Sequence, residues 1–299
     1  MIELLQNLDK FVLYLRDVRQ YSNHTITNYS NDIRQFNLFL DSYNFEEIIQ
    51  INHIHIRSWM VSLVAEKFSS KSINRKISSL RAFFKFLKRN EVIVKNPMLK
   101  IIAPKVSKRL PSYIDKSKIN EILDDNLICI SDYSTAREKV IISLLYHTGM
   151  RRSELLGLKL NDLDFNNKTL KVLGKGNKER LIPLNDGILK DLQDYLEIRE
   201  NEFPNECDFV ILTDKGLRAY PKLIYNIVNN ILKKYNASDK ASPHVLRHTF
   251  ATHLTAGGAE LNAVKELLGH SSLAATQVYT HNSIERLKEV YDRSHPKAN

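Results

Sequence analysis

Four side chains in the last third of the sequence have the types and spacing needed to attack a phosphodiester. His244 and Arg247 lie three residues apart in SPHVLRHTFATHL, His270 lies in LGHSS, and Tyr279 lies in TQVYTH. The planar fork of an arginine binds non-bridging phosphate oxygens, and a phenol becomes a nucleophile when its proton is removed and its charge is stabilised. This set predicts cleavage of a phosphate ester by a tyrosine.

A helix must present the first pair. Ser242-Pro243 is a typical N-cap and first-turn pair, so we expect His244 and Arg247 to share one face near a helix N-terminus. That end carries a positive partial charge and free N–H groups, which favour an anion. His244 and His248 have the spacing of a zinc helix, but HVLRH lacks the glutamate of HExxH, and we expect packing or capping for His248 and His253.

Two further cations cannot be chosen from the residues alone. Arg151 and Arg152 are adjacent in TGMRRSELLGL, after Gly149 at an expected break before a helix. Lys175 and Lys178 share the glycine-rich turn GKGNK between two apolar, alternating segments. A fixed cation at either place would stabilise the negative charge that develops on the oxygens of an attacked phosphorus.

Taken together, these motifs resemble the tyrosine recombinases, most closely the Xer type, over nearly the whole chain. The family motif, TGxR followed by xSEL, selects Arg151, and the distance of 24 residues from Arg151 selects Lys175. The resemblance implies six catalytic residues, which are Arg151, Lys175, His244, Arg247, His270 and Tyr279.

The resemblance also implies their roles. Tyr279, nine residues after His270, would be the nucleophile, and Lys175 would protonate the departing 5′ oxygen. His270 would donate to a phosphate oxygen and help to activate Tyr279, while Glu154 would brace the turn by pairing with a neighbouring cation. A 3′-phosphotyrosyl link stores the energy of the broken bond, so we expect strand exchange with no ATP, no metal ion and no other cofactor.

Double-stranded DNA is the partner that the resemblance implies. It further implies a homo- or hetero-tetramer on two sites, with a paralogous recombinase and an accessory regulator as possible partners. A short C-terminal helix, with Ile284, Leu287, Val290 and Tyr291 on one side, would be donated to the neighbouring protomer. The expected role is site-specific recombination that resolves chromosome or plasmid multimers, and so serves chromosome partition and cell division.

Other functions stay open at this point. An integrase or transposase of a mobile element would use the same chemistry, a type IB topoisomerase-like enzyme would relax DNA, and a non-catalytic DNA-binding protein would keep the fold alone. The chain begins directly with its helical module, which favours a simple Xer-like enzyme over an integrase with an added arm-binding domain.

The charge balance supports a polyanionic partner. The chain has 44 Lys and Arg against 34 Asp and Glu, a net charge of +10 and a pI of about 9.4. Thirteen basic residues and one acid, Glu91, lie between Lys67 and Arg109. Cys129 and Cys207 do not form a disulfide framework or a zinc motif, and acids at the start do not fit a secretory leader. We expect a cytoplasmic protein that does not cross a membrane.

Apolar periodicity predicts two domains. Helices near 4–18, 26–43, 55–68 and 73–87 would form an N-terminal four-helix DNA-binding bundle over residues 1–103. On the fourth helix Lys71, Arg75, Ser78 and Arg89 lie opposite the apolar stripe, and we expect them to contact DNA.

A proline-punctuated linker over 104–112 would lead to an α+β tyrosine-recombinase catalytic domain at 113–299, so that the whole chain is mainly α with a small β-sheet. Helices are expected near 116–125, 136–147, 186–199, 220–235, 242–257 and 262–268. Residues 169–173 and 180–184 should pair as a hairpin.

Overall fold

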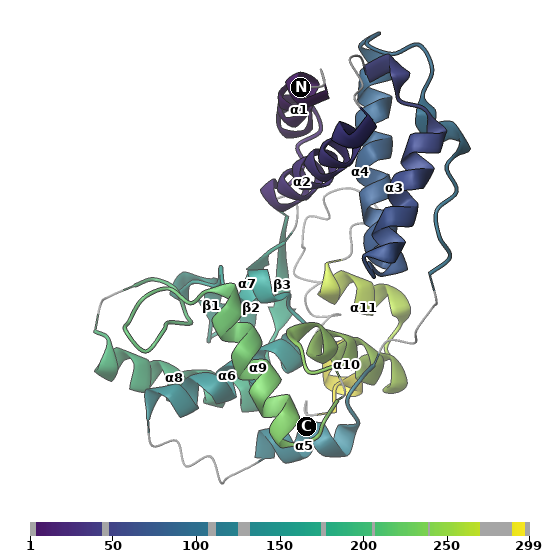
Figure 1. Cartoon of the computed structure of the whole chain (residues 1–299). Coiled ribbons are helices and arrows are strands. Elements are labelled where there is room, and N and C mark those ends of the chain that lie inside the picture. The colour runs from purple at the N-terminus through teal and green to yellow at the C-terminus, as the bar shows by residue number, and fades with distance from the viewer. Residues whose placement is uncertain are drawn as a thin grey trace. The chain divides into compact units, whose positions relative to one another are not determined.

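The computed structural model describes residues 4–43, 48–106, 112–124, 132–174, 178–204, 207–238, 240–269 and 289–296. The chain divides into two compact units, 1–109 and 110–299, each with its own hydrophobic core (Figure 1). The expected fold class, mainly helical with one small sheet, is confirmed.

The first unit contains the four predicted helices. They are α1 (Leu4–Leu13), which continues as a π-helical turn at Tyr14–Val18, α2 (Asn23–Leu40), α3 (His53–Ala65) and α4 (Ser70–Arg89). Short 3₁₀ turns occupy Asp41–Tyr43, Ile48–Gln50 and Pro97–Lys100. The starts of α2, α3 and α4 are set by Ser22, Asn52 and Ser69, whose side chains accept a backbone N–H of the first turn.

Aromatic side chains fill the core of this unit. Phe36 and Trp59 have ring centroids 5.0 Å apart, and Phe11 and Phe83 have centroids 5.3 Å apart.

The segment after α4 has no helical period in its sequence, but part of it forms a 3₁₀ turn. Asn96 accepts the N–H of Met98 and so caps the 3₁₀ turn that starts at Pro97.

The second unit contains the sheet and the remaining helices. Its helices are α5 (Lys116–Asp124), α6 (Tyr133–Thr148), α7 (Arg152–Leu155), α8 (Asp186–Glu202), α9 (Pro221–Lys234), α10 (Pro243–Ala256) and α11 (Leu261–Leu268), with a 3₁₀ turn at Leu160–Asp162. The strands β1 (Leu163–Asp164), β2 (Thr169–Leu173) and β3 (Glu179–Pro183) form an antiparallel sheet in that order. The hairpin of β2 and β3 lies within one residue of the predicted bounds, and Leu173 pairs with Glu179 at the end next to the connecting turn.

Strand β1 was not predicted. The carboxylates of Asp162 and Asp164 accept the backbone N–H groups of Lys159 and Asn167, as is typical of turn residues. The strand is missed because it is two residues long and pairs only through Leu163 with Leu170 and Asp164 with Thr169, too short a segment to show alternation.

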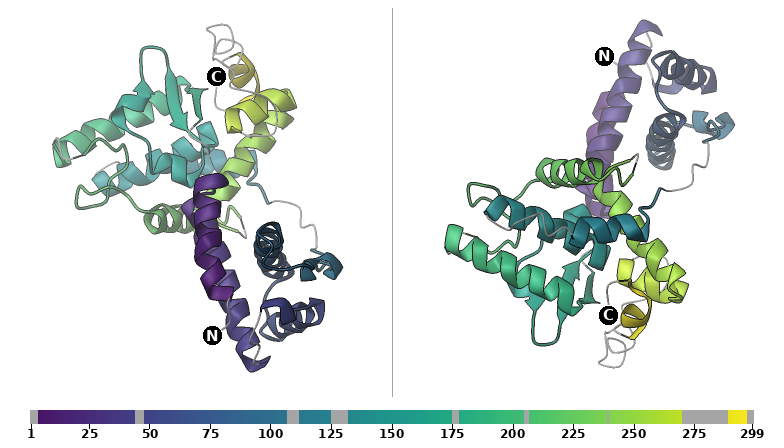
Figure 2. Two further views of the ribbon diagram at one scale, coloured as in Figure 1. Left: turned by 90° about the horizontal axis from the view of Figure 1, so that it is seen from above. Right: turned by 90° about the horizontal axis from the view of Figure 1, so that it is seen from below.

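Helix α6 is the centre of the second unit. Most of its residues are buried, because α5, α8, α9 and α10 all contact it (Figure 2). This explains why its apolar pattern has little helical asymmetry.

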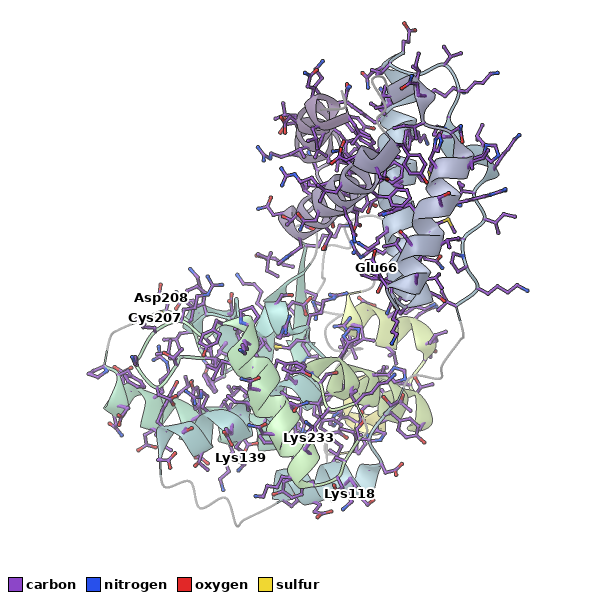
Figure 3. The ribbon with its side chains drawn as sticks, in the orientation of Figure 1. Glu66, Lys118, Lys139, Cys207, Asp208 and Lys233 are labelled. Carbon is purple, nitrogen blue, oxygen red and sulfur yellow. The ribbon has the colours of Figure 1, made fainter. Side chains whose placement is uncertain are left out.

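Arg199 of α8 is also buried. It is 2% exposed and donates to the carbonyl oxygens of Cys207 and Phe209 (Cys207 is labelled in Figure 3).

The C-terminal residues 289–294 are helical and pack against their own chain. Tyr291 is fully buried, and the ring of His295 lies 5.1 Å from that of Tyr146 and 5.0 Å from that of His147, both on α6. His253 of α10 bonds through Nδ1 to the hydroxyl of Tyr146 at 3.1 Å, which confirms a packing role for this histidine. None of the helices in the described ranges is both long and apolar enough to cross a membrane.

Candidate active site

Helix α6 ends at Thr148, three residues before the predicted catalytic Arg151. Gly149 adopts a left-handed conformation with φ of 58°, and a Cβ here would lie 2.3 Å from a ring carbon of Phe250. Only glycine satisfies both conditions. The sharp turn makes Arg151 the N-cap of α7 and leaves its side chain 33% exposed.

Glu154 holds Arg151 in place, as expected. Its carboxylate accepts the backbone N–H of Arg151 at 2.8 Å and Nη1 of the same residue at 2.6 Å. Burial opposes ionisation of Glu154, but the hydrogen bonds and charge of Arg180, together with the hydrogen bonds of Arg151, outweigh it and hold the pKa of the carboxyl below its ordinary value. The neighbouring Arg152 extends elsewhere and donates to the carbonyl of Pro221 at 3.4 Å.

Arg247 approaches the same place from α10. It is 6% exposed, and its Nη1 and Nη2 atoms each donate at 2.6 Å, to the carbonyl oxygens of Gly149 and Leu268 respectively. Burial, and then repulsion by Arg151, lower the pKa of Arg247 to about 10, so the side chain stays charged at neutral pH. These two bonds use two of the five N–H groups of the guanidinium.

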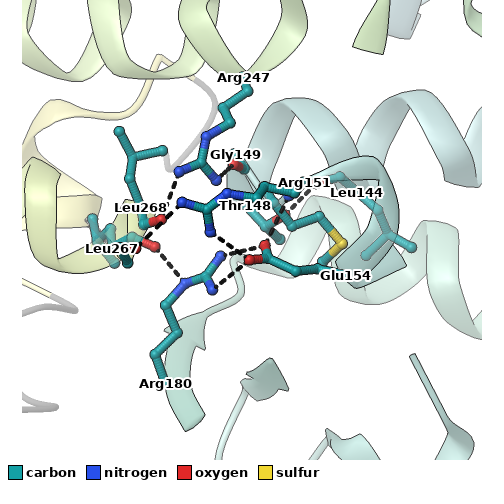
Figure 4. A network of polar contacts seen from close by, with 11 residues as sticks. Leu144, Thr148, Gly149, Arg151, Glu154, Arg180, Arg247, Leu267 and Leu268 are labelled. Carbon is teal, nitrogen blue, oxygen red and sulfur yellow. Dashed lines mark hydrogen bonds and ion pairs between the residues drawn. The ribbon is translucent and has the colours of Figure 1, made fainter. Parts of the chain in front are cut away.

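The two arginines therefore meet on one short piece of backbone. Arg151 donates through Nη2 to the carbonyl of Gly269 at 3.3 Å, one residue beyond the Leu268 carbonyl that Arg247 binds (Figure 4). Gly269 ends α11 in a left-handed conformation, with φ of 62°. Arg151 is 118 residues away from Gly269 in the sequence, and Arg247 is 21 residues away from Leu268. The fold brings both arginines to the end of α11.

Three predicted catalytic residues, Lys175, His270 and Tyr279, lie outside the described residues, but two have described neighbours at the site. His270 follows Gly269 directly. Gly174 precedes Lys175, and a Cβ on it would lie 3.7 Å from a carboxylate oxygen of Glu154. Both flanking glycines therefore lie beside the arginines.

His244 is exposed, three residues before the buried Arg247 on α10. Pro243 occupies the first turn of α10 and the extended Ser242 precedes it, so the helix begins where the sequence predicts. The side chain of Ser242 makes no capping hydrogen bond, which differs from our expectation.

Sequence reasoning missed one residue of this site. Arg180, on β3, is 4% exposed in its side chain and contacts Glu154 and the carbonyl of Leu267. The available signal was alternation, because Arg180 shares the inward face of β3 with Ile182, where a cation is unusual. In the described ranges, no three His, Cys, Asp or Glu side chains gather in a way that could hold a metal ion.

The predicted DNA contacts of the first unit have different surroundings. Lys71, Arg75, Ser78 and Arg89 are all exposed on α4. Arg75, however, pairs through Nη1 with the buried carboxylate of Asp32 at 2.5 Å, and Arg89 lies over the ring of Tyr14 at 5.9 Å.

Each of the two units matches a known sequence family. Residues 112–286 match the phage integrase family, and residues 8–91 match the phage integrase N-terminal SAM-like domain. The chain belongs to the phage integrase family. It is therefore a tyrosine recombinase, and the expected resemblance to this family is confirmed.

Full-length relatives point to the Xer type. The tyrosine recombinase XerC of Anoxybacillus flavithermus is 36% identical over 298 residues, covering 97% of this chain and 98% of the relative. XerC of Leptospira interrogans is 38% identical over 296 residues, covering 99% and 94%. The expectation of a site-specific recombinase enzyme is thus confirmed.

Solved structures share the fold. The XerH site-specific recombinase bound to a palindromic difH substrate, in a post-cleavage complex, superposes with a TM-score of 0.71 at 25% identity, covering 95% of this chain and 83% of that chain. The Tn1549 transposon integrase in complex with transposon right end DNA superposes with the same TM-score at 22% identity, covering 95% and 98%. This second likeness concerns the fold alone.

Proposed function

We propose that this recombinase cleaves DNA by attack of the Tyr279 phenolic oxygen on phosphorus. The new bond is a 3′-phosphotyrosyl ester, the phenolic proton passes to His270, and the bond from phosphorus to the 5′ oxygen breaks. Lys175 gives its proton to that oxygen, and the 5′ hydroxyl of a second duplex later reverses the step. The observation that most supports this proposal is the meeting of Arg151 and Arg247 on the carbonyls of residues 268 and 269, directly before His270.

The charges of the site suit the reaction. The guanidinium groups of Arg151, Arg180 and Arg247 surround one carboxylate, that of Glu154, which leaves a net charge of +2 at this mostly buried place. Fixed cations of this kind stabilise the charge that develops on the equatorial oxygens of the transition state. They would also stabilise a phenolate, whose ordinary pKa of about 10 otherwise keeps it protonated. We therefore propose a reaction that needs no metal ion and no ATP.

A nicked suicide duplex tests the nucleophile. The duplex carries the DNA site that the protein protects in its own genome, and the reaction contains a chelator in place of divalent metal. We expect a covalent adduct with the parent and none with Tyr279→Phe, while both proteins bind the site equally. Tyr220→Phe is the matched control, because Tyr220 is exposed and lies at the start of α9. An adduct with Tyr279→Phe would exclude this tyrosine.

Lys175 needs its own experiment. Lys175→Ala should slow cleavage of the ordinary duplex and recover on a duplex whose 5′ leaving group has a lower pKa, since such a group departs without a proton. Lys178→Ala, in the same turn, serves as the control and should behave as the parent. Equal slowing of Lys175→Ala on both duplexes would remove this lysine from the acid role.

The biological role that we propose is resolution of chromosome or plasmid multimers, in the cytoplasm, by a tetramer on two sites. The full-length similarity to XerC proteins supports this role over the integrase of a mobile element. A plasmid with two directly repeated sites should be resolved into two circles by the protein with its natural partners. Insertion of a flanked element into new sites, without resolution, would favour the alternative.

The functional division of the chain that we propose is 1–103 for DNA binding, 104–112 for the linker and 113–299 for catalysis and protomer exchange. In the first part, Lys71, Arg75, Ser78 and Arg89 would face DNA. Because Arg75 is already paired with Asp32, Lys71 is the sharper probe. Lys71→Ala should lower the slope of log affinity against log salt by about one phosphate contact, and an unchanged slope would place this face away from DNA.

A further inference from the structure

Arg180 is a buried cation that the proposed reaction does not place on the phosphate. It donates through Nη2 and Nη1 to the two carboxylate oxygens of Glu154, at 2.8 and 3.2 Å, and through Nε to the carbonyl of Leu267 at 2.8 Å. The two acceptors lie 26 and 87 residues away in the sequence. A single side chain on the sheet is thus bonded to both α7 and α11 (Figure 4).

Each of these bonds leads to a predicted catalytic residue. Glu154 is the residue that holds the guanidinium of Arg151 at 2.6 Å. Leu267 is three residues before His270, in the same stretch of carbonyls that binds Arg247 and Arg151.

Two glycines, Gly269 and Gly174, lie beside the Arg180 guanidinium. A Cβ at Gly269 would lie 3.2 Å from Nη1 of Arg180, and a Cβ at Gly174 would lie 3.5 Å from the same atom. These glycines directly precede His270 and Lys175. The Arg180 side chain therefore lies beside both glycines, where a side chain would crowd it.

Lysine cannot replace this arrangement. The Arg180 donors diverge from a rigid plane toward a carboxylate on one side and a carbonyl on the other, whereas an ammonium is a point charge on a flexible stem. A pair buried only for stability is weakly favoured, because desolvation offsets much of its attraction.

We propose that Arg180 is a positioning residue for DNA cleavage, which aligns Arg151 through Glu154 and fixes the end of α11 that carries His270. This inference rests on the proposed function and deepens it. Arg180 does not touch the phosphate in this account. It sets the places of the groups that do, and a displacement of about 1 Å in such groups can slow a reaction roughly 100-fold.

A pH profile separates positioning from simple structural support. Glu154 faces three cations, Arg151, Arg180 and Arg247, and the first two of these bond to it. In Arg180→Met, burial of the carboxyl would be opposed mainly by Arg151, so the pKa of Glu154 should rise. As pH falls through that raised value, Glu154 gains a proton and loosens its hold on Arg151. Cleavage by this variant should then slow on the acid side more than cleavage by the parent does.

The test compares the parent with Arg180→Lys, Arg180→Met and Arg199→Lys. Arg199 is the matched control, because it is equally buried and bonded to carbonyls, but at Cys207 and Phe209, away from the site. Single-turnover cleavage of the suicide duplex is measured on preformed complexes from about pH 5.5 to 8.5, a range chosen around the ordinary pKa values of Glu and His. Site affinity and thermal unfolding are recorded for each protein.

We expect Arg180→Lys to slow cleavage roughly 10- to 100-fold with affinity within about threefold of the parent. Arg180→Met should add the acid-side loss, and Arg199→Lys should cleave as the parent does. The inference is overturned if Arg180→Lys slows no more than Arg199→Lys, or if neither Arg180 variant changes the pH profile.

Two outcomes need separate provision. If Arg180→Met does not fold, Arg180→Lys is combined with Arg151→Lys, and the two effects on cleavage should be less than multiplicative, since one acts through the other. Multiplicative effects would overturn the inference. If the parent forms no adduct at Tyr279, the proposed function is wrong, and this inference, which rests on it, is wrong as well. A normal parent adduct with a normal Arg180→Lys rate defeats the inference alone.

Discussion

Removal of the Asp32 carboxylate should strongly destabilise the first unit. The side chain is 2% exposed and accepts hydrogen bonds from Lys76 at 3.1 Å and from Ser79 at 2.7 Å. It also pairs with Arg75 at 2.5 Å. Asp32→Ala would leave the ammonium of Lys76, itself 7% exposed, without its counter-charge.

The cost follows from the two cations. Loss of one partner of a buried ion pair costs about 3–5 kcal/mol, because the remaining charge stays desolvated. Lys76 keeps a bond to Gln35, and Arg75, which is 43% exposed, can turn toward water. We therefore expect the lower end, about 3 kcal/mol in the free energy of unfolding.

Urea unfolding followed by tryptophan fluorescence measures the free energy of unfolding of the first unit. The chain has one tryptophan, Trp59, and it is 1% exposed in the core of the first unit. Its emission thus reports this unit and not the other. Glu66→Ala is the control, because Glu66 is an exposed acid at the end of α3 and its removal should cost less than about 0.5 kcal/mol (Figure 3).

A second substitution completes the test. Lys76→Met in the Asp32→Ala background removes the stranded charge, so the double variant should recover most of the lost stability. An Asp32→Ala cost below about 1 kcal/mol would refute the reasoning, and so would strict additivity of the two changes to within about 0.5 kcal/mol.

Two more predictions concern the C-terminal segment. Gly257→Ala should displace it, because a Cβ there would lie 2.3 Å from the carbonyl oxygen of Ser294; we expect a loss of about 1–3 kcal/mol and faster tryptic cleavage at Arg293, and unchanged cleavage would contradict this. Stability should also fall with pH below about 6.5, because burial and neighbouring imidazoles hold the pKa of His295 well below its ordinary value. The unfolded chain then binds a proton that the folded chain does not, at about 1.4 kcal/mol per pH unit, and calorimetry that finds equal stability on both sides of that pH would exclude the effect.

Local patterns in the sequence determined much of this protein. The apolar period of α4, the Ser242-Pro243 start of α10 and the glycines at the ends of α6 and α11 each depend on residues within a few positions of one another. Helical spacing and end signals are properties of such short stretches. The motif positions, and with them the family, were equally accessible.

Tertiary structure alone decided the partners. Arg180 pairs with Glu154 and donates to the carbonyl of Leu267, and Arg75 pairs with Asp32, 43 residues away. The spacing of these residues in the sequence does not predict the contacts. The physical reason is that burial of a charged side chain requires a partner, and only the fold fixes which groups lie opposite it. The sequence therefore indicates which groups do the chemistry, whereas the folded chain decides which cations are free to bind a phosphate and which are already held.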